Sequence, residues 1–290
     1  MKTIETKKEL SAHQALLLEM LKDFDTACRK YAIRYQLFAG TALGAVRHAG
    51  FIPWDDDLDV ILLRSEYDRF FEVAAKELDP EEYYVQREGT PHWPMQFSKL
   101  RRNNTACMEK YHPKDSCIHQ GVYIDIFPCD NLCDCPATRR LQFAASKAVI
   151  AKALYMRGYE TNSITKRLFM QFCRPLPRRE LERLCMRRGD MTTQMVHTFF
   201  AAGKDYGKNI FPRSWLTESV NMPFEDGMYP VSRYYDALLT RLYGDYHQLP
   251  AAEDRKCKEH VAILDLAHSY EAHLEEQKKM TFEIHTRSIR

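Results

Sequence analysis

Hydrophobic residues recur at three- and four-residue steps over residues 9–34, which predicts an amphipathic helix at the start of the chain. Residues 35–39 are mainly apolar and run into a glycine, which predicts a short strand followed by a turn. A second helix is expected next, with Thr41 as its N-cap and with Gly50 and Pro53 as its breakers. The chain therefore opens with a helix–strand–helix unit.

Alternation of polar and apolar side chains begins again at Asp57, and residues 57–63 are expected to form a strand. A buried stripe of aromatic residues predicts a helix over 65–78. Three further strands are predicted at residues 96–101, 105–108 and 121–127. Pro128 is expected to end the last of them, because proline cannot donate to a β-ladder.

After about residue 136 the pattern becomes mainly helical, with helices expected over 138–157 and 164–188 and a proline break in the second. The sequence thus predicts an α+β protein with a mixed β-sheet core and flanking helices. We expect residues 1–135 to form the core and residues 136–290 to form a helical C-terminal part packed on it, without folding independently.

The composition fits a globular protein, with 290 residues and a formal net charge of +2. This charge gives no general signal for nucleic-acid binding. Charged residues at the N-terminus are unlike a signal peptide, and no apolar run reaches the roughly 18 residues of a membrane span. We therefore expect a cytoplasmic protein.

Nine cysteines occur at irregular spacing. Their odd number, and a sequence without an export signal, favour free thiols in a reducing compartment. Cys129, Cys133 and Cys135 form a cluster, with Cys117 and His119 upstream, that would suit zinc in its ligand types but not in its spacing. Zinc binding and buried or loop thiols both stay open.

Four carboxylates, those of Asp55, Asp56, Asp57 and Asp59, lie within five positions. Such a cluster is best tolerated around a cation. Strand alternation places Asp57 and Asp59 on one face, while Asp125 interrupts an otherwise apolar strand. If the two strands are neighbours, three carboxylates converge and would bind one or two Mg²⁺ or Mn²⁺ ions. This predicts metal-dependent chemistry at phosphorus. Asp55 and Asp56 could instead be solvated or capping residues.

Phosphate binding is expected nearby. Gly40 and Thr41 at a helix N-terminus would supply N–H groups and a hydroxyl. Lys99 and Arg101 share one strand face and would neutralise phosphate charge. With Arg47, these are the candidate residues for a donor phosphate. The alternative for Gly40 and Thr41 is a turn with a helix cap, and the alternative for Lys99 and Arg101 is a solvated strand face.

The run from Phe38 to Val60 resembles the signature of the LicD family, and this extended match is specific. Three later blocks are also similar to the family: Lys99-Leu100-Arg101 with Asn104-Thr105, the run 121–128, and Tyr243-Gly244-Asp245-Tyr246 with Leu249-Pro250. The resemblance covers residues from about 10 to 260. It implies a nucleotidyltransferase-like fold and a cytoplasmic bacterial transferase typified by phosphocholine transfer, with fukutin-type proteins as eukaryotic relatives.

The resemblance further implies a CDP-linked donor such as CDP-choline and a glycan acceptor. The acceptor hydroxyl would attack the distal phosphorus, CMP would leave, and a decorated lipopolysaccharide, teichoic acid or capsule precursor would remain. Asp57 and Asp59 would hold the metal, and Asp125 would complete the site and take the acceptor proton. Ser232 and His247 depart from the family pattern, which leaves the role of the C-terminal tail open.

Four aromatic residues are candidates for contact with a choline group: Trp54, Trp93, Tyr111 and Tyr123. His260 stands near a position where relatives carry a histidine. It is a weaker catalytic candidate, with a capping or surface role as the alternative.

Residues 166–188 contain eight Lys or Arg against two acids, interleaved with large apolar residues. This stretch would suit peripheral contact with an anionic membrane at its inner face, where lipid-linked glycan is assembled. The simpler interpretation is a solvated helix packed on the core.

Two other functions remain open at this stage. One is a nucleotidyltransferase that places a nucleoside monophosphate on a small hydroxylated acceptor. The other is a non-catalytic glycan-binding protein, although the repulsive cluster of carboxylates argues against it.

Overall fold

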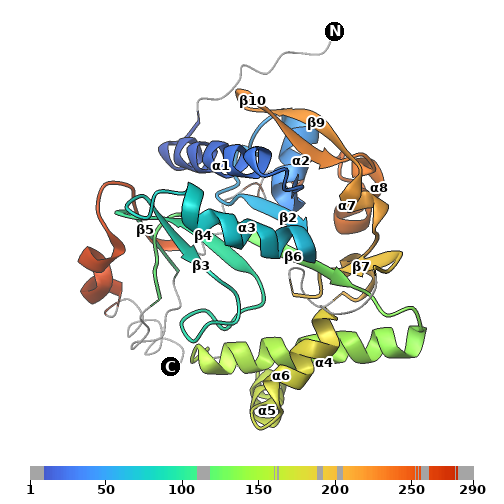
Figure 1. Cartoon of the computed structure of the whole chain (residues 1–290). Helices are drawn as coiled ribbons and strands as arrows, with labels where there is room; N and C mark the ends of the chain where they lie inside the picture. Colours follow the sequence, from blue (N-terminus) through green and yellow to red (C-terminus); the bar gives the residue numbers. More distant parts are fainter. Residues whose placement is uncertain are drawn as a thin grey trace.

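The computed structural model describes residues 10–109, 118–159, 161, 163–187, 192–200, 205–251, 253, 255, 261–277 and 279. In this part of the chain, helices flank a curled mixed sheet (Figure 1). The predicted α+β fold class is confirmed.

The central sheet has the strand order β1-β2-β6-β4-β3, and it continues from β6 through β7 to β8. Its β2 and β6 run parallel, while its other pairs run antiparallel. The two strands that carry Asp59 and Asp125 are thus neighbours, as the site prediction requires. The strands are β1 (Gln36–Leu37), β2 (Asp59–Leu63), β3 (Tyr83–Gln86), β4 (Ser98–Arg102), β6 (Tyr123–Asn131), β7 (Met195–His197) and β8 (Ile210–Pro212).

Two small antiparallel sheets accompany the central one. A hairpin joins β9 (Ser219–Phe224) to β10 (Gly227–Ser232), and β11 (Val261–Asp265) pairs with β5 (Ala106–Glu109). The strands beyond residue 187 were not predicted from the sequence. The region after residue 136 therefore combines helices with strands, and two of these strands pair with β5 and β6 of the core.

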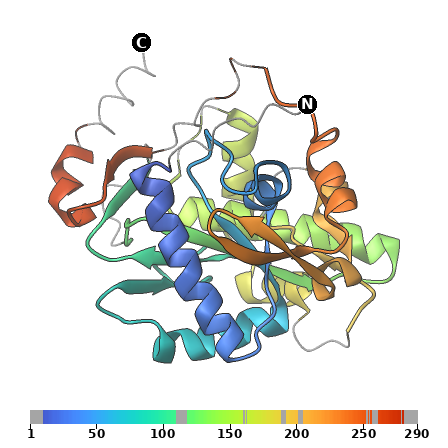
Figure 2. The same ribbon diagram turned by 90° about the horizontal axis from the view of Figure 1, so that it is seen from above.

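Three helices lie near the parallel strands: α1 (Ala12–Lys30), α2 (Ala39–His48) and α3 (Arg64–Glu77). Ser11 caps α1 in a reciprocal capping box with Gln14. Figure 1 shows α1 along the upper side of the molecule, and Figure 2 shows it crossing the strands diagonally. The predicted helix over 9–34 is confirmed with shorter bounds, and the one over 65–78 is confirmed with a shift of one residue.

A second layer covers the lower side of the sheet in Figure 1 and consists of α4 (Pro136–Met156), α5 (Ile164–Cys173) and α6 (Arg178–Met186). Both α5 and α6 pack against α4. The predicted break between them is confirmed, because two prolines separate the two helices. The remaining helices are α7 (Ser214–Thr217), α8 (Tyr235–Tyr243), η1 (Gly207–Asn209) and η3 (Tyr270–His273). None of the described helices is long and apolar enough to cross a bilayer.

The expectation that Pro128 ends its strand is wrong, since β6 continues to Asn131. On one side of β6, pairing with β4 stops at Ile126, and pairing with β7 begins only at Asp130. Pro128 lies in the unpaired interval, where the missing N–H costs no ladder bond on that side.

The main hydrophobic core lies between the sheet and helices α1 to α3. All five residues of β2 are buried, as expected for a parallel strand covered on both faces. The predicted stripe of α3 is buried as well: Tyr67, Phe70, Phe71 and Ala74. This packing fixes β2 and β6, and with them the positions of Asp59 and Asp125.

Candidate active site

A cavity of about 1020 Å³ opens at the N-terminus of α2. Its walls come from three parts of the chain: α2, the segment 52–59, and the end of α8 with the residues after it. We call residues 52–57 the acid loop. The cavity is lined by four carboxylates of the predicted site, Asp55, Asp56, Asp57 and Asp59, and by Trp54, Tyr243 and Tyr246.

The helix beside this cavity begins three residues earlier than expected, at Ala39 with Phe38 as its N-cap. The expectation that Thr41 is its N-cap is therefore wrong. The Thr41 hydroxyl instead accepts a hydrogen bond of 2.8 Å from the backbone N–H of Asp59. The first helical bond at this end runs from Ala42 N–H to the Phe38 carbonyl, so the N–H groups of the first turn have no intrahelical acceptor.

Gly40 brings the acid loop against the start of α2. A Cβ at residue 40 would lie 2.6 Å from Oδ2 of Asp55, so only glycine leaves room for this carboxylate. A carboxylate near a helix N-terminus is favoured by the helix dipole. The same dipole would favour a phosphate at this place in the cavity.

Two residues that sequence reasoning missed hold the acid loop. The side-chain amide of Gln14 donates to the carbonyl of Asp55 at 3.0 Å and to that of Ile52 at 3.5 Å. The Glu225 carboxylate accepts from Phe51 N–H at 2.9 Å. No local sequence pattern indicates these contacts, since α1 and the β9–β10 hairpin are far from the loop in sequence.

The acidic side chains form a compact group. One carboxylate oxygen from each of Asp55, Asp56 and Asp57 lies within 4.8 Å of the other two. Asp57 precedes β2 instead of opening it, so its place comes from the loop and not from strand alternation as we expected. Asp59 follows at the first position of β2, and its register partner on β6 is Asp125.

Burial raises the pKa of Asp59 well above its usual range, and the neighbouring Asp57 and Asp125 carboxylates raise it further. The Lys99 ammonium opposes this shift. Crowded carboxylate oxygens are the ligand type that Mg²⁺ and Mn²⁺ prefer. The residues present therefore fit a divalent ion.

Asp125 is paired with a buried cation, because Lys99 Nζ lies 2.9 Å from its Oδ1. Lys99 also lies over the Tyr123 ring, 3.3 Å from the ring centroid. Burial raises the pKa of Asp125, whereas Lys99 counteracts that rise. Burial in turn lowers the pKa of Lys99. Asp125 and Lys99 thus form a desolvated pair beside Asp59.

Arg101 lies on the same face of β4 as Lys99, but its guanidinium binds other partners. Its guanidinium donates to Oε1 of Gln86 and to the carbonyl of Gly121, both at 2.8 Å. Neither Lys99 nor Arg101 is among the residues that line the cavity. Arg47 does line it and donates to the Tyr246 carbonyl at 2.8 Å, which ties α2 to the segment after α8.

Among the aromatic candidates, Trp54 lines the cavity, whereas Trp93 is buried in the core. Tyr111 and His260 lie outside the described residues. The sequence singled out Tyr243 only as part of a block similar to the LicD family, without a role in the site. It lies near the cluster, and burial together with the Asp59, Asp55 and Asp57 carboxylates raises its pKa.

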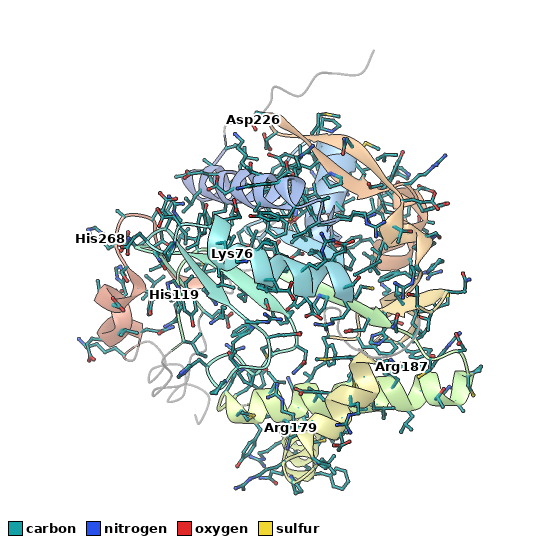
Figure 3. The ribbon with its side chains drawn as sticks, in the orientation of Figure 1. Lys76, His119, Arg179, Arg187, Asp226 and His268 are labelled. Carbon is teal, nitrogen blue, oxygen red and sulfur yellow. The ribbon has the colours of Figure 1, made fainter. Side chains whose placement is uncertain are left out.

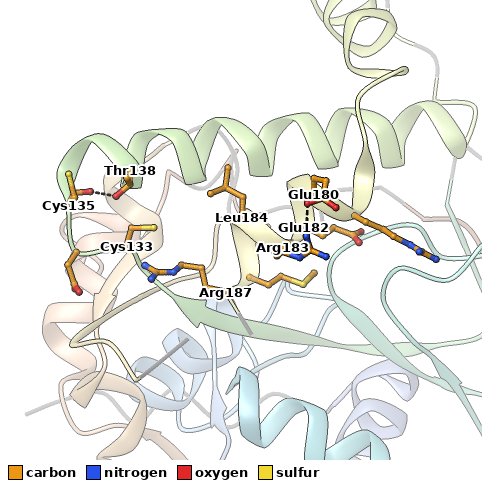
Figure 4. Close-up of a pocket in the computed structure, with 11 residues that line it drawn as sticks. Cys133, Cys135, Thr138, Glu180, Glu182, Arg183, Leu184 and Arg187 are labelled. Carbon is orange, nitrogen blue, oxygen red and sulfur yellow. Dashed lines mark hydrogen bonds and ion pairs between the residues drawn. The ribbon is translucent and has the colours of Figure 1, made fainter. Parts of the chain in front are cut away.

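A second cavity, of about 1230 Å³, lies between the N-terminal end of α4 and α6 (Figure 4). Its charges are mixed and partly paired, as between Arg183 and Glu180 at 2.7 Å. Cys133 and Cys135 line it, while Cys129 is buried in an apolar cluster with Phe127. Within the described residues, the one group of three close metal-binding side chains is the aspartate group, and no cysteine belongs to such a group.

The mixed sheet, with carboxylates at the starts of two parallel strands and a helix N-terminus beside them, defines a nucleotidyltransferase-like fold. The profile of the LicD/FKTN/FKRP nucleotidyltransferase domain matches residues 32–184, just over half of the chain, and the chain belongs to this family. The match contains the acid loop, β2 and β6.

Similarity to individual proteins extends further. The chain is 28% identical over 263 residues to the lipopolysaccharide cholinephosphotransferase LicD of Haemophilus influenzae, which covers 86% of this chain and 96% of that protein. Uncharacterized proteins of Rickettsia typhi and Rickettsia prowazekii are 40% and 43% identical over 73 and 61 residues, 25% and 21% of this chain and 22% and 23% of their own lengths. The family and its phosphotransferase member identify the chain as a transferase.

Proposed function

We propose that this protein transfers phosphocholine from CDP-choline to a hydroxyl of a cell-surface glycan, such as lipopolysaccharide or its lipid-linked precursor, with release of CMP. The observation that carries the proposal is the cavity itself, where Asp55, Asp56, Asp57 and Asp59 face the N-terminus of α2. The near full-length similarity to a lipopolysaccharide cholinephosphotransferase supports this choice of donor and acceptor.

In the proposed reaction, the acceptor oxygen attacks the phosphorus that carries choline. The bond from that phosphorus to the bridging oxygen breaks, and CMP leaves with the electron pair. The acceptor proton passes to a carboxylate, for which we propose Asp125, because burial raises its proton affinity while Lys99, 2.9 Å away, favours its ionised form before the reaction. Asp57 and Asp59, with Asp55 and Asp56, would hold Mg²⁺ or Mn²⁺, which supplies charge stabilisation for the phosphates when bound.

The donor phosphates would lie against Gly40 and the first N–H groups of α2, with Arg47 at the side of the cavity. Lys99 and Arg101 would contribute through their positive field and not through direct contact, because both side chains are buried among protein partners. Trp54, Tyr243 and Tyr246 offer aromatic faces for the quaternary ammonium group.

The test is CMP release from CDP-choline in the presence of a glycan acceptor, with Mg²⁺ or with EDTA. We expect metal-dependent CMP formation and an acceptor product whose mass increases by one phosphocholine. A product carrying a nucleotide would instead support the nucleotidyltransferase alternative. If no CDP-linked donor gives CMP release, the result would support the alternative of a non-catalytic glycan-binding protein.

Matched variants sharpen this experiment. Asp57→Asn removes one carboxylate of the cluster and should abolish CMP release. Asp226→Asn removes one carboxylate at the β9–β10 hairpin, where Asp226 pairs with Lys22 on the surface, and should leave the rate unchanged. Equal rates in the two variants would contradict the assignment of the site.

A further inference from the structure

The outer surface of α5 carries an apolar stripe with no partner in the described part of the chain. Ile164, Leu168 and Phe172 follow one another at four-residue steps, and they are 63%, 57% and 70% exposed. Residues at this spacing share one helix face. Met170 and Cys173 lie on the opposite face and are buried against α4.

This burial pattern is inverted relative to an ordinary amphipathic surface helix. Such a helix turns its large apolar side chains inward and its polar side chains to water. Here α5 buries only Met170 and Cys173 and exposes its four other large apolar side chains, Ile164, Leu168, Phe169 and Phe172. Contiguous exposed apolar surface of this kind marks a site of contact with another protein or with a membrane.

The charge around the stripe selects the kind of contact. From Thr161 to Arg179 the sequence contains five Lys or Arg and no Asp or Glu. Of these, Arg178 is neutralised by Glu182 at 2.5 Å. Arg167 lies on α5 itself, Arg174 follows its last turn, and Arg179 lies in the first turn of α6, so exposed positive charge borders both α5 and its C-terminal end.

The place of α5 in the fold suits contact with an extended surface. Figure 1 shows α5 at the lower edge of the molecule, below α4 and on the side away from α1 and the β9–β10 hairpin. In Figure 3, Arg179 is labelled at this lower edge and Asp226 at the upper one. A protruding helix meets a flat partner without hindrance from its neighbours.

We propose that α5 is a membrane-docking helix that inserts Ile164, Leu168 and Phe172 into the interface of an anionic phospholipid bilayer. Helices that lie in a bilayer interface combine apolar side chains on one face with Lys and Arg at its borders. The basic residues add attraction to anionic head groups, and this attraction decays over a Debye length. The proposal stands on the surface of α5 and does not depend on the proposed reaction.

Vesicle sedimentation tests the proposal directly, without a measurement of activity. The full chain should pellet with vesicles of phosphatidylglycerol and phosphatidylethanolamine, and it should pellet less with neutral phosphatidylcholine vesicles or at high salt. Free phosphocholine is added in every arm, so that occupation of the aspartate cavity does not contribute. Equal recovery in the supernatant with anionic and neutral vesicles would overturn the proposal.

Two pairs of variants separate the contributions of the stripe and of the charge. Leu168→Gln with Phe172→Gln should lower the partition constant at least about tenfold, whereas Met228→Gln with Leu264→Gln, at exposed apolar positions on β10 and β11, should leave it nearly unchanged. Arg167→Gln with Arg179→Gln should weaken binding to anionic vesicles only. Lys22→Gln with Arg233→Gln removes the same charge elsewhere and should have little effect.

The competing occupant of the stripe is a second copy of the chain. Gel filtration of the same variants tests it, and circular dichroism confirms that each variant is folded. The membrane proposal would be overturned if the parent protein is a dimer that does not bind anionic vesicles and if Leu168→Gln with Phe172→Gln dissociates this dimer. A monomer that binds anionic vesicles through the stripe supports it.

Discussion

Asp59 on β2 and Asp125 on β6 occupy paired positions on two adjacent parallel strands. The first faces a cluster of carboxylates, and the second lies 2.9 Å from the Lys99 ammonium. Two core strands therefore bring negative charge to one point, and the buried Lys99 and Arg101 side chains offset part of it. Because burial magnifies charge interactions, this arrangement has consequences for stability as well as for catalysis.

The charge of Asp59 should destabilise the metal-free protein. Burial and two neighbouring carboxylates raise its pKa, so its ionised form is disfavoured in the folded state. We expect Asp59→Asn to increase the free energy of unfolding by about 1–3 kcal/mol in EDTA, as measured by urea denaturation. Asp226→Asn is the control at an exposed carboxylate. A variant less stable than the parent protein would contradict this account.

The same shift predicts how that difference depends on pH. A carboxyl whose pKa is raised by folding binds its proton more tightly in the folded state, so its contribution to stability is greatest at low pH. This contribution is lost as pH rises from the unfolded value of 3.8 through the folded pKa. The advantage of Asp59→Asn should therefore be absent below this window and grow across it. A difference that is constant from acid to neutral pH would exclude titration of Asp59 as its cause.

A divalent ion should reverse the penalty. Binding to the folded state alone stabilises a protein by about 2.7 kcal/mol at one hundred times the dissociation constant. We expect Mg²⁺ or Mn²⁺ to raise the melting temperature of the parent protein, and Asp57→Asn to lose this response. Differential scanning fluorimetry with Mg²⁺ and with EDTA measures both. An equal rise in parent and variant would place the ion elsewhere.

Two glycines of α2 should behave differently when they are replaced by alanine. At Gly40 the new Cβ meets a carboxylate oxygen of Asp55 at 2.6 Å, and a side chain can move away. At Gly44 it meets the backbone carbonyl of Gly50 at 2.4 Å, which cannot yield cheaply. We expect Gly40→Ala to weaken metal binding with little loss of stability.

Gly44→Ala should cost about 1–3 kcal/mol of stability through overpacking. Urea denaturation and metal titration of the two variants separate the effects. If Gly40→Ala binds Mg²⁺ as tightly as the parent protein does, the close approach of Asp55 to α2 has no part in the metal site.

Much of the fold follows from local pattern. The period of apolar residues predicted α1, α3, α4 and the pair α5 and α6, because each helix has a continuous buried stripe or a clear breaker. The strands β3 and β7 to β11 were not predicted, and β7 and β8 have only three residues each. The positions of β7 and β11 depend on pairing with the distant strands β6 and β5, and local pattern does not contain that information. The β9–β10 hairpin pairs locally and was missed all the same.

The site was predicted in part for the same reason. Strand order brought Asp59 beside Asp125 as expected, but Asp57 reaches the cavity from a loop. The loop conformation depends on Gln14 and Glu225, which are distant in sequence. The role of Thr41 also changed, because a tertiary hydrogen bond to Asp59 replaced the expected cap. Metal identity and the roles of individual carboxylates stay predictions.

The final prediction concerns a buried ion network at the other end of β2 and β6 from Asp59 and Asp125. Arg64 at the start of α3 donates to both carboxylate oxygens of Asp130 on β6, at 2.6 and 2.8 Å. It also pairs with Glu88 at 2.5 Å. Arg64→Met would leave two buried carboxylates without their cation, and breaking such a network by removing one partner costs about 3–5 kcal/mol. The exposed pair of Arg183 with Glu180 offers the control, because Arg183→Met should cost no more than about 1 kcal/mol. Adding Asp130→Asn to Arg64→Met should recover part of the loss, since it removes one of the stranded charges. Urea denaturation of the parent protein, Arg64→Met, Asp130→Asn and the double variant measures the coupling, and strictly additive losses would show that the network does not act as a unit.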